Sequence, residues 1–112
     1  MQHVRVADVP ALIASFDAGA RPVLLDVREP WEVATAALSV PGATTVCLPM
    51  NEVPQRLVEL DRDQPVLALC HHGVRSQHVG GFLERQGFAQ VFNVVGGIDA
   101  WSREVDASVP LY

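Results

Sequence analysis

The chain has 112 residues, of which 49% are hydrophobic and 19% charged, and we expect a single folded domain spanning residues 1–112. Its net charge of −5 argues against nucleic acids or anionic membranes as partners, and no apolar run approaches the roughly 20 residues of a membrane helix. Because the start lacks the pattern of a secretory signal peptide, we expect a cytoplasmic protein.

Four short apolar runs, each bordered by turn-forming residues, have the length and composition of buried strands. They cover residues 23–27, 44–48, 65–69 and 91–95. Because segments with helical signals lie between them, the order of elements predicts an α/β fold. We expect a mainly parallel central sheet that is flanked by helices on both faces.

Helix signals follow the first of these runs. Pro30 suits the first turn of a helix, and Glu32 suits its positively polarised end, where we expect Glu29 and Glu32 to be solvated. Apolar residues recur at helical spacing in two later segments, namely Val53, Leu57 and Leu60 in one, and Val79, Phe82 and Leu83 in the other. The second of these helices is expected to end at Gly87.

Cys70 lies between a predicted strand and a predicted helix. In an open α/β sheet, the carboxyl ends of the strands form the edge where ligands bind, and a helix N-terminus offers unpaired N–H groups to an anion. A thiolate is such an anion, and the cation Arg75 would favour it further. We therefore interpret Cys70 as a reactive nucleophile rather than an inert buried thiol.

The residues that follow the cysteine each have a physical role in this interpretation. Gly73 would permit backbone angles closed to other residues, and Arg75 could hold loop carbonyls or a bound oxyanion. Ser76 could cap the helix or donate its hydroxyl to sulfur. His71 and His72 could assist an anionic substrate, although neighbouring side chains rarely point the same way. The substrate-binding loop is predicted to comprise His71, His72, Gly73, Val74, Arg75 and Ser76.

The second cysteine, Cys47, lies within an apolar run without a flanking glycine or cation, so we interpret it as a small core residue. A disulfide with Cys70 is not expected in a reducing compartment. No metal site is expected either, because there is no C-x-x-C pair and the adjacent His71 and His72 lack the spacing of ligands on one helical face.

The loop of residues 70–76 resembles the active loop of the rhodanese family. Three further segments resemble the other signature segments of that family in the same order, namely Leu25-Asp26-Val27-Arg28-Glu29, Val40-Pro41-Gly42-Ala43 and Val95-Gly96-Gly97-Ile98-Asp99-Ala100-Trp101. The resemblance spans most of the chain and implies a rhodanese-like domain of the single-domain thiosulfate sulfurtransferase type. One departure is Leu38-Ser39, where the family commonly shows Gly-His, so that histidine's local contacts are absent.

The resemblance implies that Cys70 takes a sulfane sulfur from thiosulfate or a persulfide donor and holds it as a persulfide. Cyanide, a small thiol or a protein cysteine would then accept the sulfur, and no metal or organic cofactor is implied. Asp26 and Arg28 resemble family positions that support the active loop. An internal ion pair or a helix cap accounts for the same two residues equally well.

Two alternative functions stay open at this point. A non-catalytic rhodanese-like regulatory or protein-binding module would use the same anion-friendly pocket, although such modules usually lack the cysteine. The related phosphatases and arsenate reductases carry one more residue between cysteine and arginine, whereas four residues separate Cys70 from Arg75. A persulfide carrier that serves a dedicated protein partner would be a variant of the sulfurtransferase.

Overall fold

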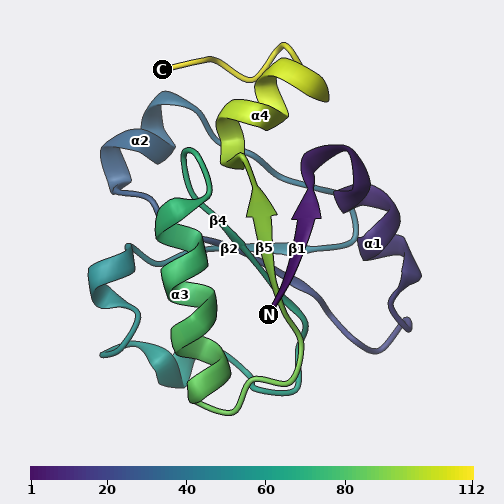
Figure 1. Cartoon of the computed structure of the whole chain (residues 1–112), viewed down its shortest axis with the longest axis vertical. Coiled ribbons are helices and arrows are strands. Elements are labelled where there is room, and N and C mark those ends of the chain that lie inside the picture. The colour runs from purple at the N-terminus through teal and green to yellow at the C-terminus, as the bar shows by residue number, and fades with distance from the viewer.

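The four predicted apolar runs form strands of one parallel sheet in the computed structural model, which describes all 112 residues. A fifth strand precedes them, and the strand order is β1-β5-β4-β2-β3. The strands are β1 (Gln2–Arg5), β2 (Val23–Asp26), β3 (Thr44–Cys47), β4 (Val66–Leu69) and β5 (Val91–Val95). The helices are α1 (Val9–Ser15), α2 (Pro30–Thr35), α3 (Val74–Arg85) and α4 (Gly97–Glu104) (Figure 1). The α/β fold with a parallel sheet is therefore confirmed.

Side chains that alternate along the central strands β2, β4 and β5 build an apolar layer on both faces of the sheet. One layer receives Val9 and Ile13 from α1 together with Ile98 from α4. The other receives Val79 and Leu83 from α3. The prediction of helices on both faces is thus confirmed, with α3 on one face and α1 and α4 on the other (Figure 1).

Two sequence expectations about local structure are wrong. The segment with Val53, Leu57 and Leu60 forms no α-helix but only short 3₁₀ turns at Met50–Glu52 and Leu57–Glu59. Pro54 lies between these turns and has no N–H to donate, which interrupts an α-helical hydrogen-bond ladder. Strand β3 is likewise not buried: it is an edge strand of the sheet, and Thr44 and Cys47 at its ends are exposed.

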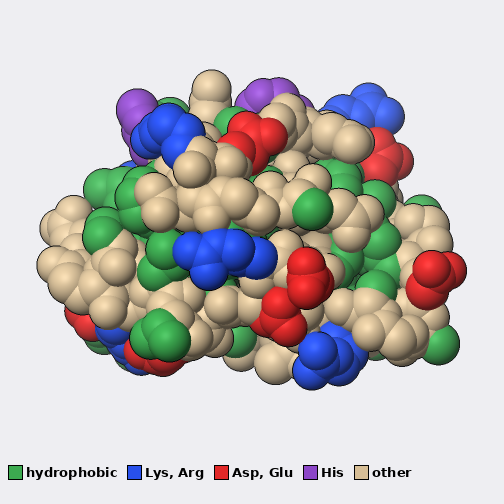
Figure 2. Space-filling model, turned by 90° about the horizontal axis from the view of Figure 1, so that it is seen from below, with side chains coloured by type: hydrophobic (Ala, Val, Ile, Leu, Met, Phe, Trp, Pro, Cys, Tyr) green, Lys and Arg blue, Asp and Glu red, His purple; other side chains and the backbone are tan.

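The carboxyl ends of all five strands meet at one edge of the sheet, because every pairing is parallel. Strand β4 lies between β2 and β5, so the loop that leaves β4 emerges beside the ends of both neighbours. The opposite end of the molecule carries basic and acidic side chains interspersed with apolar ones (Figure 2). The longest helix, α3, has 12 residues, and no helix is both long and apolar enough to span a bilayer.

Candidate active site

The alternation of side chains along β4 decides where Cys70 points. Val66 and Cys70 belong to the apolar layer under α3, whereas Leu67 and Leu69 belong to the opposite layer. Cys70 directly follows the last residue of β4 and is 1% exposed. Its side chain therefore lies at the ligand-binding edge of the sheet, facing the N-terminal end of α3.

The sulfur of Cys70 is held by its own loop. The backbone N–H of Gly73 donates to Sγ over 3.0 Å, and the hydroxyl of Ser76 lies 3.3 Å from Sγ. Gly73 precedes α3 with a φ of 101°, a left-handed conformation that glycine adopts without strain. Ser76 lies inside α3 rather than capping it, and its hydroxyl donates to Asn93 Oδ1 over 2.5 Å. Because the Ser76 proton is donated to Asn93, Ser76 Oγ can accept a hydrogen bond from the thiol of Cys70.

Helix α4 fixes the carbonyl side of the same loop. The N–H groups of Ile98 and Asp99 donate to the carbonyls of Cys70 and His71 over 2.9 and 3.1 Å. These amides belong to the first turn of α4 and have no partners within the helix. Gly97 makes this approach possible, since a Cβ there would lie 2.4 Å from each of the two carbonyl oxygens.

Replacing Gly97 with alanine is expected to displace the Cys70 loop from α4. Gly97 has a φ of 61°, so alanine would add left-handed strain to the backbone clash, and we expect about 2 to 4 kcal/mol of lost stability. Urea unfolding of Gly97→Ala measures this change. Gly19→Ala is the matched control, because nothing lies within 4 Å of a Cβ at Gly19. Equal unfolding midpoints for the two variants would contradict this account of the loop.

Arg75 is engaged differently from the sequence expectation. Its two terminal nitrogens donate to the two carboxylate oxygens of Glu32 over 2.6 and 2.9 Å, rather than to loop carbonyls. Glu32 is 3% exposed, so the expectation of a solvated glutamate is wrong. The hydrogen bonds from Arg75, against the opposing effect of burial, lower the pKa of Glu32 to about 2. The pKa of Arg75 is raised chiefly by Glu32, with a smaller contribution from the charge of Cys70.

Asp26 and Arg28 form a buried ion pair at the end of β2. Arg28 Nε and Nη2 donate to the two carboxylate oxygens of Asp26 over 2.9 and 2.7 Å. Burial alone would lower the pKa of Arg28, but its hydrogen bonds to Asp26 and Tyr112 outweigh that effect and raise it. The remaining nitrogen, Nη1, donates to the Tyr112 hydroxyl and to the Glu32 carbonyl over 3.0 and 3.3 Å. The pair therefore reaches the Cys70 loop only through other residues.

His71 and His72 lie face to face, contrary to the expectation that neighbours diverge. Their ring centroids are 3.9 Å apart, and the ring planes make an angle of 27°. One ring nitrogen from each histidine and one carboxylate oxygen of Asp99, the atoms that could bind a metal ion, all lie within 4.8 Å of one another. The nitrogen lone pairs lie in the ring planes, so stacked rings direct them side by side rather than towards one ion. Asp99 is also paired with Arg103 over 3.0 Å. These three side chains, as arranged, do not converge on a metal position.

Three residues of the site were not identified from the sequence as part of it. Asn93 could have been recognised as a polar residue within an apolar strand, where it binds Ser76 and donates to the Gly73 carbonyl over 3.3 Å. Glu32 forms a capping box with Glu29, and that motif predicts the start of a helix. It does not predict that Glu32 binds Arg75, which lies 43 residues away in the sequence. Tyr112 is the single tyrosine of the chain and has no local motif.

Cys47 is exposed at the end of β3, so the expectation of a core residue is wrong. Burial is the largest of the effects that raise the pKa of its thiol. In the sheet register, Asp26 lies between Cys47 and Leu69, which places Cys47 and Leu69 about two strand spacings, or roughly 9–10 Å, apart. A disulfide to the residue after Leu69 would require movement of the backbone.

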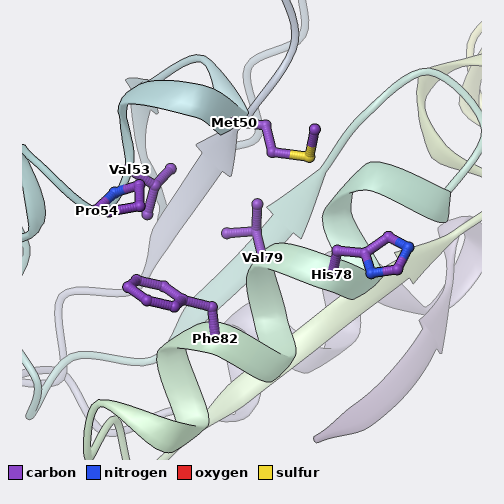
Figure 3. Close-up of a pocket in the computed structure, with 6 residues that line it drawn as sticks. All are labelled: Met50, Val53, Pro54, His78, Val79 and Phe82. Carbon is purple, nitrogen blue, oxygen red and sulfur yellow. The ribbon is translucent and has the colours of Figure 1, made fainter.

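The hollows of the surface lie away from the sulfur of Cys70. An apolar hollow of about 200 Å³ separates α3 from the turns after β3. In Figure 3, Val53 and Pro54 lie opposite Val79 and Phe82, while the His78 ring points away from them. The lining of this hollow consists of Met50, Val53, Pro54, His78, Val79 and Phe82. Two larger hollows are also lined without Cys70. The sulfur is thus covered by its own loop and does not open into a preformed cavity.

Known proteins resemble this chain both in sequence and in structure. Residues 9–104 match the family model described as "Rhodanese-like domain". Rhodanese-like/PpiC domain-containing protein 12, chloroplastic, of Arabidopsis thaliana is 39% identical over 80% of this chain, and the match spans 30% of that relative. Thiosulfate sulfurtransferase GlpE of Vibrio cholerae serotype O1 is 32% identical, over 99% of this chain and 97% of that relative. A rhodanese-like domain protein from Staphylococcus aureus has a similar structure, with a TM-score of 0.75 and 25% identity over 100% of this chain and 99% of that one.

Proposed function

The chain belongs to the rhodanese-like domain family, and on this premise we propose that it is a sulfurtransferase that carries sulfur on Cys70. One observation carries the assignment to Cys70: its Sγ accepts the Gly73 N–H at the N-terminal end of α3, at the carboxyl edge of a central strand. An amide aimed at sulfur in this position stabilises a thiolate before the reaction and a persulfide after it.

We propose thiosulfate as the sulfur donor in a two-step reaction. The Cys70 thiolate attacks the sulfane sulfur, the S–S bond of thiosulfate breaks, and sulfite leaves with the bonding electron pair. The product is a Cys70 persulfide. Cyanide or a thiolate then attacks the terminal sulfur, which leaves as thiocyanate or as a new persulfide and regenerates the Cys70 thiolate. The relative from Vibrio cholerae, named a thiosulfate sulfurtransferase, supports this donor.

The loop residues have distinct roles in this reaction. The Gly73 N–H stabilises negative charge on sulfur, and Ser76 Oγ is close enough to accept a hydrogen bond from the thiol before it ionises. Arg75 supplies a positive charge that interacts with the charge of Cys70, and the carboxylate of Glu32 holds its guanidinium in place. His72 and Val74 are exposed on the outer side of the loop, where a donor would approach.

The geometry disfavours the phosphatase alternative. A phosphatase of this type would present its arginine to the phosphate oxygens, whereas both terminal nitrogens of Arg75 donate to Glu32. A non-catalytic binding module would not need an amide directed at a buried thiol. We also propose that residues 1–112 act as one rhodanese-like domain, because β1 extends the sheet and Tyr112 contacts the site, although both lie outside the matched residues 9–104.

Intact-mass spectrometry after incubation with thiosulfate tests the proposed function. We expect an adduct of one sulfur atom that cyanide removes with formation of thiocyanate. Sulfite, which lacks a sulfane sulfur, is the matched control and should leave the mass unchanged. If thiosulfate gives no adduct but glutathione persulfide does, thiosulfate is the wrong donor. No adduct with either donor would overturn the sulfurtransferase proposal, and hydrolysis of an aryl phosphate would then favour the phosphatase alternative.

A further inference from the structure

The stretch that follows α4 returns across the carboxyl edge of the sheet and brings Tyr112 onto the Cys70 loop. Figure 1 shows this stretch running from α4 towards α2. The Tyr112 hydroxyl donates to Glu32 Oε2 over 2.7 Å and accepts from Arg28 Nη1 over 3.0 Å. It therefore joins the Arg28–Asp26 ion pair to the carboxylate that holds Arg75.

The ring of Tyr112 makes a second, independent contact with the loop. It stacks on His71 with centroids 3.9 Å apart and planes at 8°. The Trp31 ring lies edge-on to it at 6.0 Å, and the Arg28 guanidinium lies 5.8 Å from its centroid. His71 lies between the rings of Tyr112 and His72. Its Nε2 is buried and has no hydrogen-bond partner. Because Nε2 has no partner, the stacks on Tyr112 and His72 are restraints on the His71 ring, and the stack on Tyr112 is the more nearly parallel of the two.

We propose that Tyr112 is a positioning residue for sulfur transfer, holding Arg75 in place through Glu32 and the Cys70 loop through its stack on His71. This inference rests on the proposed function, and it adds a residue outside the matched family segment. Tyr112 is assigned no contact with the sulfur atom. Its action passes entirely through Glu32 and His71, on two sides of the loop.

The charges around the hydroxyl keep it in the form that this role requires. Burial raises the pKa of Tyr112 to about 12, so the hydroxyl stays protonated and can donate to Glu32. Glu32 stays ionised, since its pKa is lowered to about 2. Without the hydroxyl, this carboxylate would keep only Arg75 and the Glu29 backbone N–H, which donates to Oε1 over 3.1 Å. Arg28 Nη1 would retain only the longer bond to the Glu32 carbonyl.

Two variants separate the hydroxyl from the ring. Tyr112→Phe keeps the stack on His71 but removes both hydrogen bonds, and Tyr112→Leu removes both contacts. We expect sulfur loading from thiosulfate to slow by about fivefold in Tyr112→Phe and further in Tyr112→Leu. Leu111→Ala is the matched control, because Leu111 is an exposed neighbour on the same stretch, and it should load sulfur at the wild-type rate.

NMR titration of the His71 imidazole gives a readout that does not depend on activity. Burial, followed by the charge of His72, lowers the pKa of His71, while the charges of Glu32 and Asp99 and a hydrogen bond to the Tyr112 backbone oppose them. Tyr112→Leu removes part of that burial, so the pKa should rise towards its ordinary value, whereas Tyr112→Phe should leave it low. A His71 pKa that is lower in Tyr112→Phe than in Tyr112→Leu would show that the aromatic ring, without its hydroxyl, is sufficient to bury His71.

The outcomes distinguish this inference from the proposed function. Wild-type rates in both tyrosine variants of a protein that does load sulfur would overturn the positioning role alone. Failure of the wild-type protein to load sulfur from both thiosulfate and glutathione persulfide would overturn the proposed function, and the role of Tyr112 in it. If Tyr112→Leu fails to fold, Tyr112→Phe decides: an unchanged loading rate overturns the role of the hydroxyl, and a reduced rate supports it.

Discussion

Replacing Cys70 with serine is expected to abolish sulfur loading, with a loss of at least about 1000-fold in rate. A serine hydroxyl at this position stays protonated at neutral pH and is a far weaker nucleophile towards sulfane sulfur than a thiolate. The Gly73 amide and the neighbouring Ser76 would remain in place, so the change removes the nucleophile rather than its surroundings. Intact-mass spectrometry after incubation with thiosulfate measures the effect.

The second cysteine supplies the matched control for this experiment. Cys47→Ser should load sulfur at the wild-type rate, because Cys47 lies two strands away from β4 on the edge strand β3. An adduct that persists in Cys70→Ser and disappears in Cys47→Ser would show that sulfur is carried by Cys47. That outcome would refute the assignment of Cys70.

Replacing Asp26 with alanine is expected to lower the free energy of unfolding by about 3–5 kcal/mol. The side chains of Asp26 and Arg28 are 2% and 0% exposed, so the variant would leave a guanidinium buried without its carboxylate. A charge in this position can neither reach water nor give up its proton. Urea unfolding followed by circular dichroism measures the loss.

An exposed ion pair of the same type provides the comparison for this variant. Asp8 pairs with Arg5 over 3.3 Å, and their side chains are 56% and 80% exposed. Asp8→Ala should leave the unfolding midpoint almost unchanged, because solvent screens such pairs and replaces the lost contact. Similar midpoints for Asp8→Ala and Asp26→Ala would mean that Arg28 finds other partners, and the buried pair would not be a main support of this edge of the sheet.

The strands predicted from the sequence are present because the pattern that predicts them is also what stabilises them. A continuous apolar run such as residues 66–69 is stable only where both sides are covered, which is the situation of a central parallel strand. Strand β1 was not predicted, because its sequence Gln2–Arg5 buries only Val4 and has no comparable pattern. Strand β1 forms because its backbone pairs with the edge of β5 that no other strand occupies.

The wrong expectations about Cys47 and Glu32 share one physical cause. Each was inferred from neighbours along the chain, whereas burial depends on what packs against the residue from elsewhere. Cys47 lies in an apolar run but on an edge strand, so its side chain stays exposed. Glu32 lies at a helix start, but Arg75 and Tyr112 cover it from distant parts of the chain.

The layered fold and the position of the cysteine loop between β4 and α3 could be predicted from the sequence, because both follow from local patterns of apolar residues, glycine and charge. The surroundings of that loop depend instead on how distant segments pack in the folded chain. Glu32, Asn93 and Tyr112 reach it from three separate segments. Amides at the start of α4 bind its carbonyls, and the absence of a side chain at Gly97 permits this approach. These hydrogen bonds and stacking contacts depend on distances across the folded chain, which no spacing along the sequence encodes.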